Sequence, residues 1–360
     1  VRSRRQRQMC IRDRCEAARL SGAGPWRVLW QVVLPLARPG LVAGAAMAFV
    51  SALGNFGIPA MLGIPVGYYT LPTLIYQKMA SFGPGMLQHV AALSMLVGAI
   101  ALAGVALQMR LQSRARYRLV GMNGRPATMS LGRWHVALEA LIALVLAMVL
   151  LAPLVALVSS SLVPAMGVSL SAQSFTLHAY EEMLSRQGVT WRAAGNSLLL
   201  AGSAALLLLA LAVPLAWFMV RRPSRWGAVV NACLEIPYAL PGTVLAVACI
   251  LLLAKPLPVL QVGLYGTLGI IFVAYLARFI VVALKPVQAS MQQLDPALEE
   301  AAQLAGADVW QRLRSILLPL LAPSAFAGGL LVFLTAVNEL TVSALLLSLI
   351  HISEPTRLRR

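Results

Sequence analysis

The chain carries the stretch EAARLSG at residues 16–22 and repeats it as EAAQLAG at residues 300–306, 284 positions later. A Leu-Pro-Leu sequence follows each copy at the same distance, at residues 34–36 and 318–320. Aligned without a gap from residue 16 to residue 62, the two copies are identical at 18 of 47 positions. A gapless repeat of this length indicates two homologous halves, each of which places the same polar segment before an apolar helix.

The composition is that of an integral membrane protein. The chain is 59% hydrophobic and 11% charged, whereas soluble domains need about 25% charged residues. Its mean hydropathy is +0.80. Apolar runs of about 20 residues predict membrane-spanning helices rather than barrel strands. We therefore expect an all-α polytopic membrane protein whose spans lie at 40–62, 88–109, 136–158, 195–219, 228–253, 264–284 and 324–347.

The net charge of +17 is explained by arginines that lie between the apolar runs. Under the positive-inside rule, the arginine-rich connection 110–134 and the turn at Arg221, Arg222 and Arg225 are cytoplasmic. The segment 159–194 lacks a positive excess and is expected outside. Alternation from these anchors places both repeated segments, 10–38 and 285–322, in the cytoplasm. Basic residues are not interleaved with aromatic ones, so the lipid bilayer, not nucleic acid, is the expected partner.

Each repeated segment is predicted to form two short helices joined by a turn. In the second copy, Asp295 and Pro296 suit a helix start, and Gly306 suits a helix end that requires a positive φ. In the next short helix, one apolar stripe is expected from Trp310, Leu313 and Leu317, with Trp26, Leu29 and Val33 as its counterparts. The alternative is an amphipathic pair lying on lipid, which would need no glycine at a fixed offset.

This pattern of Glu-Ala-Ala, a glycine and a Leu-Pro at fixed spacing resembles the cytoplasmic coupling loop of ABC-importer permeases, the inner-membrane components that depend on binding proteins. In that family the loop docks into a groove of the ATP-hydrolysing subunit. The resemblance implies a fused permease that contacts an ABC ATPase dimer and a periplasmic substrate-binding protein in a bacterial inner membrane. ATP and magnesium would bind the ATPase, and this chain would need no cofactor. The implied coupling residues are Glu16, Ala17, Gly22, Glu300, Ala301 and Gly306.

The stretches 234–244 and 334–343 resemble those of ferric-iron-type fused permeases. Related permeases for thiamine, aminoethylphosphonate and polyamines share parts of both stretches. An ion-driven secondary transporter is the alternative of another class. Such transporters usually carry inverted repeats, whereas an even number of spans separates the two copies here and makes them parallel.

Four polar residues within the apolar runs are candidates for the translocation path: Asn55, Glu235, Asn338 and Glu339. Ionisable residues within a membrane are costly and often functional. For Glu235 the alternative is a carboxylate near the cytoplasmic interface, and for Glu339 it is an interhelical hydrogen bond. Gly40 with Gly44, matched by Ser324 with Gly328, predicts close helix packing.

The sequence supports no catalytic or metal site. Its four histidines are scattered, its four cysteines have no ligand spacing, and it contains no glycine-lysine phosphate loop. We therefore expect a protein that is not an enzyme, with no catalytic, cofactor or metal residues.

The expected organisation has five parts. Residues 1–14 and 348–360 resemble translated sequencing-adapter sequence and are interpreted as non-native tails. Residues 15–109 would be the C-terminal part of the first permease half, 110–134 a cytoplasmic linker, and 135–347 the second half. On this interpretation, the first half lacks the helices before its coupling loop, and the second lacks the helix that corresponds to 88–109.

Overall fold

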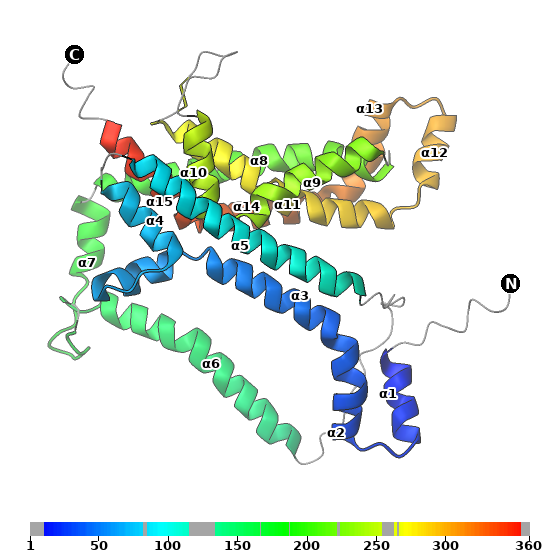
Figure 1. Ribbon diagram of the computed structural model, residues 1–360, viewed down its shortest axis with the longest axis horizontal. Coiled ribbons are helices and arrows are strands. Elements are labelled where there is room, and N and C mark those ends of the chain that lie inside the picture. Colours follow the sequence, from blue (N-terminus) through cyan, green and yellow to red (C-terminus); the bar gives the residue numbers. More distant parts are fainter. Residues whose placement is uncertain are drawn as a thin grey trace. The chain divides into compact units, whose positions relative to one another are not determined.

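A computed structural model describes residues 11–81, 85–114, 134–165, 167–186, 188–221, 224–253, 263–264 and 266–353. Within these ranges every regular element is a helix, which confirms the all-α prediction (Figure 1). The α-helices are α1 Ile11–Leu20, α2 Pro25–Val28, α3 Leu34–Leu53, α4 Leu71–Ala80, α5 Met86–Arg114, α6 Trp134–Ser161, α7 His178–Glu181, α8 Gly188–Arg221, α9 Arg225–Ala239, α10 Gly242–Leu253, α11 Leu268–Gln293, α12 Ala297–Leu304, α13 Val309–Arg312, α14 Leu318–Val337 and α15 Leu340–Ser353. Short π-helices cover Leu29–Val33, Pro59–Gly63, Glu182–Arg186 and Leu313–Leu317, and a 3-10 turn covers Ile64–Val66.

Among the described residues, five helices are long and apolar enough to cross a membrane, or six if the bent pair of α9 and α10 is counted as one span. Four of the predicted spans correspond to α5, α6, α8 and α11. The predicted linker lies largely, and the predicted tails partly, outside the described residues.

Three predicted spans are interrupted. The span 40–62 is shorter than predicted, because α3 ends at Leu53. The span 324–347 is shifted, because the apolar helix there covers Val309–Val337 and α15 begins only at Leu340. The span 228–253 bends by 111° between α9 and α10. Pro241 lies at this bend and has no N–H to donate into a continuous helix.

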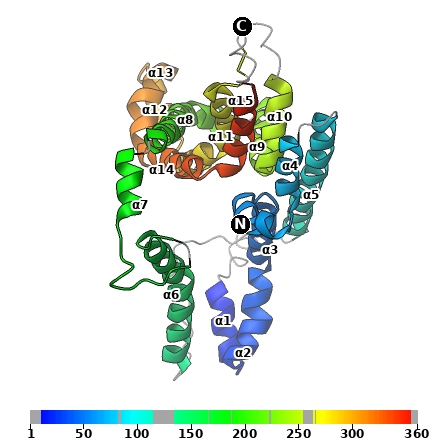
Figure 2. The same ribbon diagram turned by 90° about the vertical axis from the view of Figure 1, so that its left-hand side faces the viewer.

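The chain divides into two compact units, and each is described by itself. One comprises residues up to 43 together with 111–195, and the other comprises 44–110 together with 196 onward. In the first unit α1 packs beside α2 and the π-helix that follows it (Figure 2). In the second unit α11 packs most extensively on α14.

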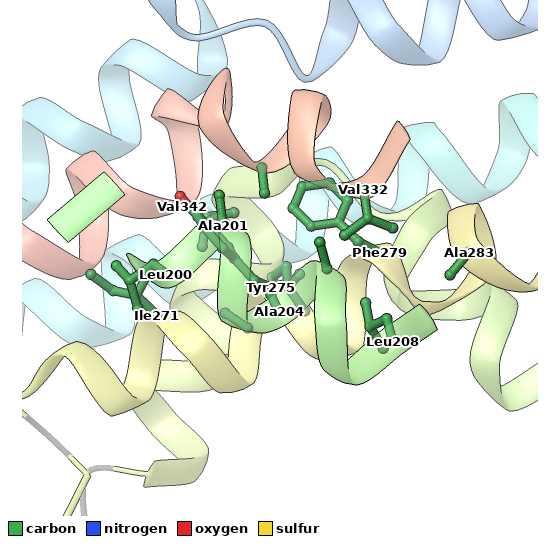
Figure 3. Close-up of a cluster of buried hydrophobic side chains, with 14 of the residues drawn as sticks. Leu200, Ala201, Ala204, Leu208, Ile271, Tyr275, Phe279, Ala283, Val332 and Val342 are labelled. Atoms are coloured by element: carbon green, nitrogen blue, oxygen red, sulfur yellow. The ribbon is translucent and has the colours of Figure 1, made fainter. Parts of the chain in front are cut away.

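The core of the second unit lies where α8, α11 and α14 meet. Figure 3 shows Ala204 and Leu208 of α8 beside Tyr275 and Phe279 of α11, with Val332 of α14 close by. All five side chains are at most 5% exposed. The apolar contact area among these three helices joins them into one packed body.

Small residues allow this close packing in the second copy of the repeat. A Cβ added to Gly328 would lie 2.7 Å from the carbonyl oxygen of Ala283, so α14 approaches the α11 backbone directly. The prediction of close packing is therefore confirmed at Gly328. At Gly40 and Gly44 an added Cβ would meet no atom within 4 Å, and close packing there stays a prediction.

The repeat in sequence is also a repeat in structure. α2, the π-helix Leu29–Val33 and α3 begin and end at positions that correspond, at an offset of 284 residues, to the bounds of α13, the π-helix Leu313–Leu317 and α14. Each copy therefore places its helical hairpin at the start of a long apolar helix.

Candidate functional site

Both repeated segments end their first helix with the same turn. Gly22 has φ +79° and Gly306 has φ +87°, in the left-handed region that glycine adopts without steric cost. In the first copy the N–H of Gly22 donates to Arg19 O at 2.9 Å, and the N–H of Ala23 donates to Ala18 O at 3.0 Å. This pair of bonds defines the Schellman motif of a helix C-terminus.

The second copy makes the same two bonds. The N–H of Gly306 donates to Gln303 O at 3.0 Å, and the N–H of Ala307 donates to Ala302 O at 3.0 Å. The prediction that a glycine with positive φ ends each helix is confirmed. The turn fixes the angle between α12 and α13, which form a hairpin at one end of α11 (Figure 1).

Side-chain caps fix the two helix starts of the second copy. Asp295 Oδ1 accepts the N–H of Ala297 at 3.0 Å, as its position before the helix predicts. The next start was not predicted: Asp308 Oδ1 accepts the N–H of Gln311 at 2.6 Å, and Gln311 Oε1 accepts the N–H of Asp308 at 2.9 Å. This reciprocal capping box satisfies two N–H groups that the helix itself leaves free. The residue pair Asp and Gln three positions apart was its signal in the sequence.

Identical large apolar side chains are exposed in both copies. Leu20 is 90% and Leu304 is 91% exposed, while Trp26 is 72% and Trp310 is 65% exposed. The prediction that Trp310 shares a stripe with Leu317 is wrong, because Leu317 is only 1% exposed. The π-helical turn at Leu313–Leu317 has a wider period than an α-helix and changes the face on which later side chains lie. Exposed apolar side chains that recur at matching positions suit contact with a protein partner or with the membrane.

The residues implied by the coupling-loop resemblance lie on the same hairpins. Those with described side chains are all exposed: Ala17, Gly22, Glu300, Ala301 and Gly306. Glu16 lies within α1, and its side chain is outside the described part.

The neighbouring carboxylate, Glu299, is buried and was missed by the sequence analysis. Its Oε2 accepts the indole Nε1–H of Trp217 at 2.9 Å, and its Oε1 accepts the Nε–H of Arg221 at 2.6 Å. Arg221 also donates through Nη2 to the carbonyl of Leu294 at 3.1 Å. The end of α8 is therefore bound both to α12 and to the residue that follows α11.

A second ion pair, partly buried, lies where α14 breaks. Arg278 Nε is 3.2 Å from Glu339 Oε2, and their side chains are 19% and 12% exposed. Arg278 also donates through Nη1 to the carbonyl of Leu240 at 3.1 Å, at the bend between α9 and α10. The sequence analysis gave a hydrogen bond between helices as the alternative role of Glu339. The contact that Glu339 makes with another helix is an ion pair. Arg278 was not singled out from the sequence, although an arginine inside the apolar run 264–284 was the signal.

Asn55 and Glu339, at equivalent positions of the two copies, accept the same kind of local hydrogen bond. Asn55 Oδ1 accepts the N–H of Ile58 at 3.4 Å, and Glu339 Oε1 accepts the N–H of Val342 at 3.2 Å. Each side chain thus accepts from the residue three positions ahead, just after α3 or α14 ends. Asn338 instead donates to the carbonyl of Leu334 at 3.0 Å, within its own helix.

Glu235 lies on the wall of a cavity of about 570 Å³ in the second unit. It pairs with Lys285 and accepts from Asn231 Nδ2 at 2.9 Å. Arg278 and Lys285 lie on the same wall, together with Val50, Ser51, Gly54, Val105, Tyr238, Ala239, Leu240, Pro241 and Val281. In the described part of the chain, no three His, Cys, Asp or Glu side chains come together as metal ligands. The arrangement provides a cavity beside a broken helix, with the charged side chains of Glu235, Arg278 and Lys285 on its wall.

Comparison with known proteins defines the class to which these features belong. The sequence matches the family of binding-protein-dependent transport system inner membrane components over residues 12–117 and again over residues 209–351. Because these segments cover more than half of the chain, the protein belongs to this family. It is a multi-pass inner-membrane protein.

Particular relatives include permeases of several transport systems. The chain is 27% identical, over 92% of its length and 58% of the relative, to a probable ABC transporter permease protein, y4fN, of Sinorhizobium fredii. It is 26% identical, over 92% of its length and 51% of the relative, to the putative ferric transport system permease protein FbpB 1 of Haemophilus influenzae. A shorter match, 38% identical over 26% of the chain and 39% of the relative, is to the molybdenum transport system permease protein ModB of Escherichia coli. The chain thus spans 51 to 58% of the length of the two relatives that it matches almost throughout.

Proposed function

We propose that this chain is the permease subunit of an ATP-driven ABC importer, in which it forms the translocation path and couples to the ATPase. The observation that carries this proposal is the twin hairpin, with the same glycine turn and the same exposed leucine and tryptophan in both copies. Two equivalent surfaces suit a dimeric partner, so each hairpin would contact one ATPase subunit. ATP hydrolysis belongs to that partner, and a periplasmic binding protein delivers the substrate.

The path would run through the cavity at the bend between α9 and α10 and past Asn55, Glu235, Asn338 and Glu339. Residues from α3, α5, α9 and α11 line this cavity, so a shift of any one helix changes its shape. The hairpin α12–α13 lies between α11 and α14 in the chain, so closure of the ATPase on it would move α11, which carries Arg278, and α14, which Glu339 follows. We expect the ion pair between Arg278 and Glu339 to respond to coupling.

Ferric iron is the substrate that we propose. Support comes from the resemblance of residues 234–244 and 334–343 to ferric-iron-type permeases and from the similarity to a relative named for ferric transport. The molybdenum relative and the resemblance to thiamine, aminoethylphosphonate and polyamine permeases define the competitors. Since the binding protein selects the substrate before the membrane step, the ligand that it binds decides among these candidate substrates.

The experiment is uptake into proteoliposomes that contain the chain, its ATPase subunit and its binding protein. Radiolabelled ferric iron is expected to enter only with ATP inside and loaded binding protein outside. ATP-driven uptake of molybdate, thiamine, aminoethylphosphonate or spermidine instead of iron would change the assigned substrate and leave the assignment as an ABC importer permease intact. Uptake driven by a proton or sodium gradient, without ATPase or binding protein, would instead establish the secondary-transporter alternative.

A further inference from the structure

Glu299 is the only acidic side chain that is buried in the part of the chain that the structure describes, at 8% exposed. It lies on α12, beside the exposed Glu300 and Ala301 of the predicted coupling surface. Its neighbours are not from the hairpin itself: Trp217 and Arg221 are 82 and 78 residues away in the sequence. A buried carboxylate at this place therefore connects the hairpin to a distant helix.

Two hydrogen bonds from α8 converge on Glu299 of α12. Trp217 and Arg221 are four residues apart on α8, so both side chains lie on one face and meet the two oxygens of a single carboxylate. Arg221 is 16% and Glu299 is 10% exposed at the side chain, so the charges are removed from water. Buried pairs cost desolvation and persist only with satisfied geometry, in contrast to exposed pairs, which contribute little.

α8 belongs to the packed body of the second unit. Ala204 and Leu208 of α8 lie against α11 and α14 in Figure 3, and a Cβ added to Gly329 of α14 would lie 2.7 Å from Leu209 Cδ1. In the turned view the end of α8 is seen beside α12, as their bonds require (Figure 2). A displacement of α12 thus reaches this body through the chain and also through Glu299.

We propose that Glu299 is a positioning residue that locks α12 to the end of α8, so that the hairpin and α8 move as one body when the ATPase closes. The role of this lock in coupling rests on the proposed function. The lock between α12 and α8 does not. Glu300 and the exposed Leu304 would receive the motion, and Glu299 would pass it through Arg221 and Trp217 to α8. Glu299 touches neither substrate nor nucleotide in this account.

The lock is tested on the full chain alone, in lipid nanodiscs, by spin labels placed at Leu298→Cys on α12 and Leu211→Cys on α8. The native cysteines are first replaced by serine. Glu299→Gln is expected to broaden the distance distribution between the labels. Glu139→Gln, the same change at a side chain that is 67% exposed and paired with His135, is the matched control and should leave the distribution narrow. A distribution in Glu299→Gln as narrow as the wild type would overturn the proposal.

A second variant separates positioning from folding. Arg221→Met combined with Glu299→Met removes both charges, so no unpaired charge stays buried, and its melting temperature should be close to that of the wild type. In the proteoliposome assay, iron transported per ATP hydrolysed should fall about ten-fold in both variants, a typical coupling magnitude, with ATPase binding unchanged. Wild-type coupling in the double variant would mean that packing suffices and would refute the lock. Absence of ATP-driven uptake in the wild type would refute the proposed function instead, while the spin labels still decide the lock.

Discussion

Replacing Gly306 with alanine tests whether the turn of the second hairpin depends on a left-handed residue. The backbone has φ +87° at this position, and an added Cβ would meet no atom within 4 Å. The cost is therefore backbone strain alone, about 1–2 kcal/mol for a residue other than glycine in this region. Such a penalty changes the equilibrium between the closed and the opened turn by a factor of roughly 5–30.

The assay is amide hydrogen exchange of the full chain in nanodiscs, read at the two bonds that close the turn. Exchange at residue 306 and at Ala307 should accelerate by that factor in Gly306→Ala, because opening breaks their bonds to Gln303 and Ala302. Gly306→Asn should lie between wild type and alanine, since asparagine tolerates the left-handed region better. Gly40→Ala is the matched control, because Gly40 lies inside α3 with no atom within 4 Å of its added Cβ and no positive φ.

Unchanged exchange in Gly306→Ala would refute the argument that the glycine is required for backbone reasons. Accelerated exchange together with full binding of the ATPase subunit would show that the turn is strained by the substitution but that its geometry does not govern docking. The same substitution at Gly22, with φ +79°, is expected to act equally on the first hairpin.

Three further results are expected. Gly328→Ala should lower the free energy of unfolding by about 1–3 kcal/mol, because the added Cβ would lie 2.7 Å from Ala283 O. Gly44→Ala, at the aligned position, should not lower it. Equal melting temperatures for the two variants would contradict this packing argument. Leu304→Ser should reduce co-purification of the ATPase subunit without lowering the melting temperature. Val66→Ser, at a side chain that is 77% exposed and lies outside the hairpins, should leave co-purification unchanged. Equal binding of the ATPase by both variants would show that Leu304 is not part of the docking surface. Glu339→Gln and Asn55→Ala should each reduce iron uptake in proteoliposomes while ATPase binding persists, and uptake at the wild-type rate would exclude both from the path.

The hairpins were predictable because their determinants are local. A glycine three residues beyond Arg19 or Gln303, and prolines that begin the long helices, specify the turn and the entry in any surroundings. The long spans were predictable for a similar reason, since a bilayer requires about 20 apolar residues whatever the fold. Orientation, path and substrate stay predictions.

The breaks and the ion pairs were not predictable to the same extent, because hydropathy does not distinguish a straight apolar run from a bent one. α14 ends at Val337 within an apolar run, and Glu339, which follows it, becomes an ion-pair partner only once Arg278 is brought from another helix. Glu299 and Glu300 are adjacent and chemically identical, yet one is buried and the other exposed. Only the position of α8, fixed by tertiary packing, decides which of the two turns inward.

The two copies of the hairpin separate what forms the turn from what anchors it. Gly24 stands at the position of Asp308 and Cys15 at the position of Glu299, so the first copy has neither that capping carboxylate nor the carboxylate that binds Arg221. The second short helix nevertheless begins and ends at corresponding residues in both copies, and the Schellman bonds are the same. The backbone of the hairpin therefore follows from the shared leucines, glycine and prolines, whereas Asp308 and Glu299 add stability and attachment to the second copy. If the lock at Glu299 transmits motion as proposed, the second hairpin is tied to a helix outside its own segment by a contact that the first cannot form, and cross-linking each hairpin to the ATPase in turn should give unequal effects on transport.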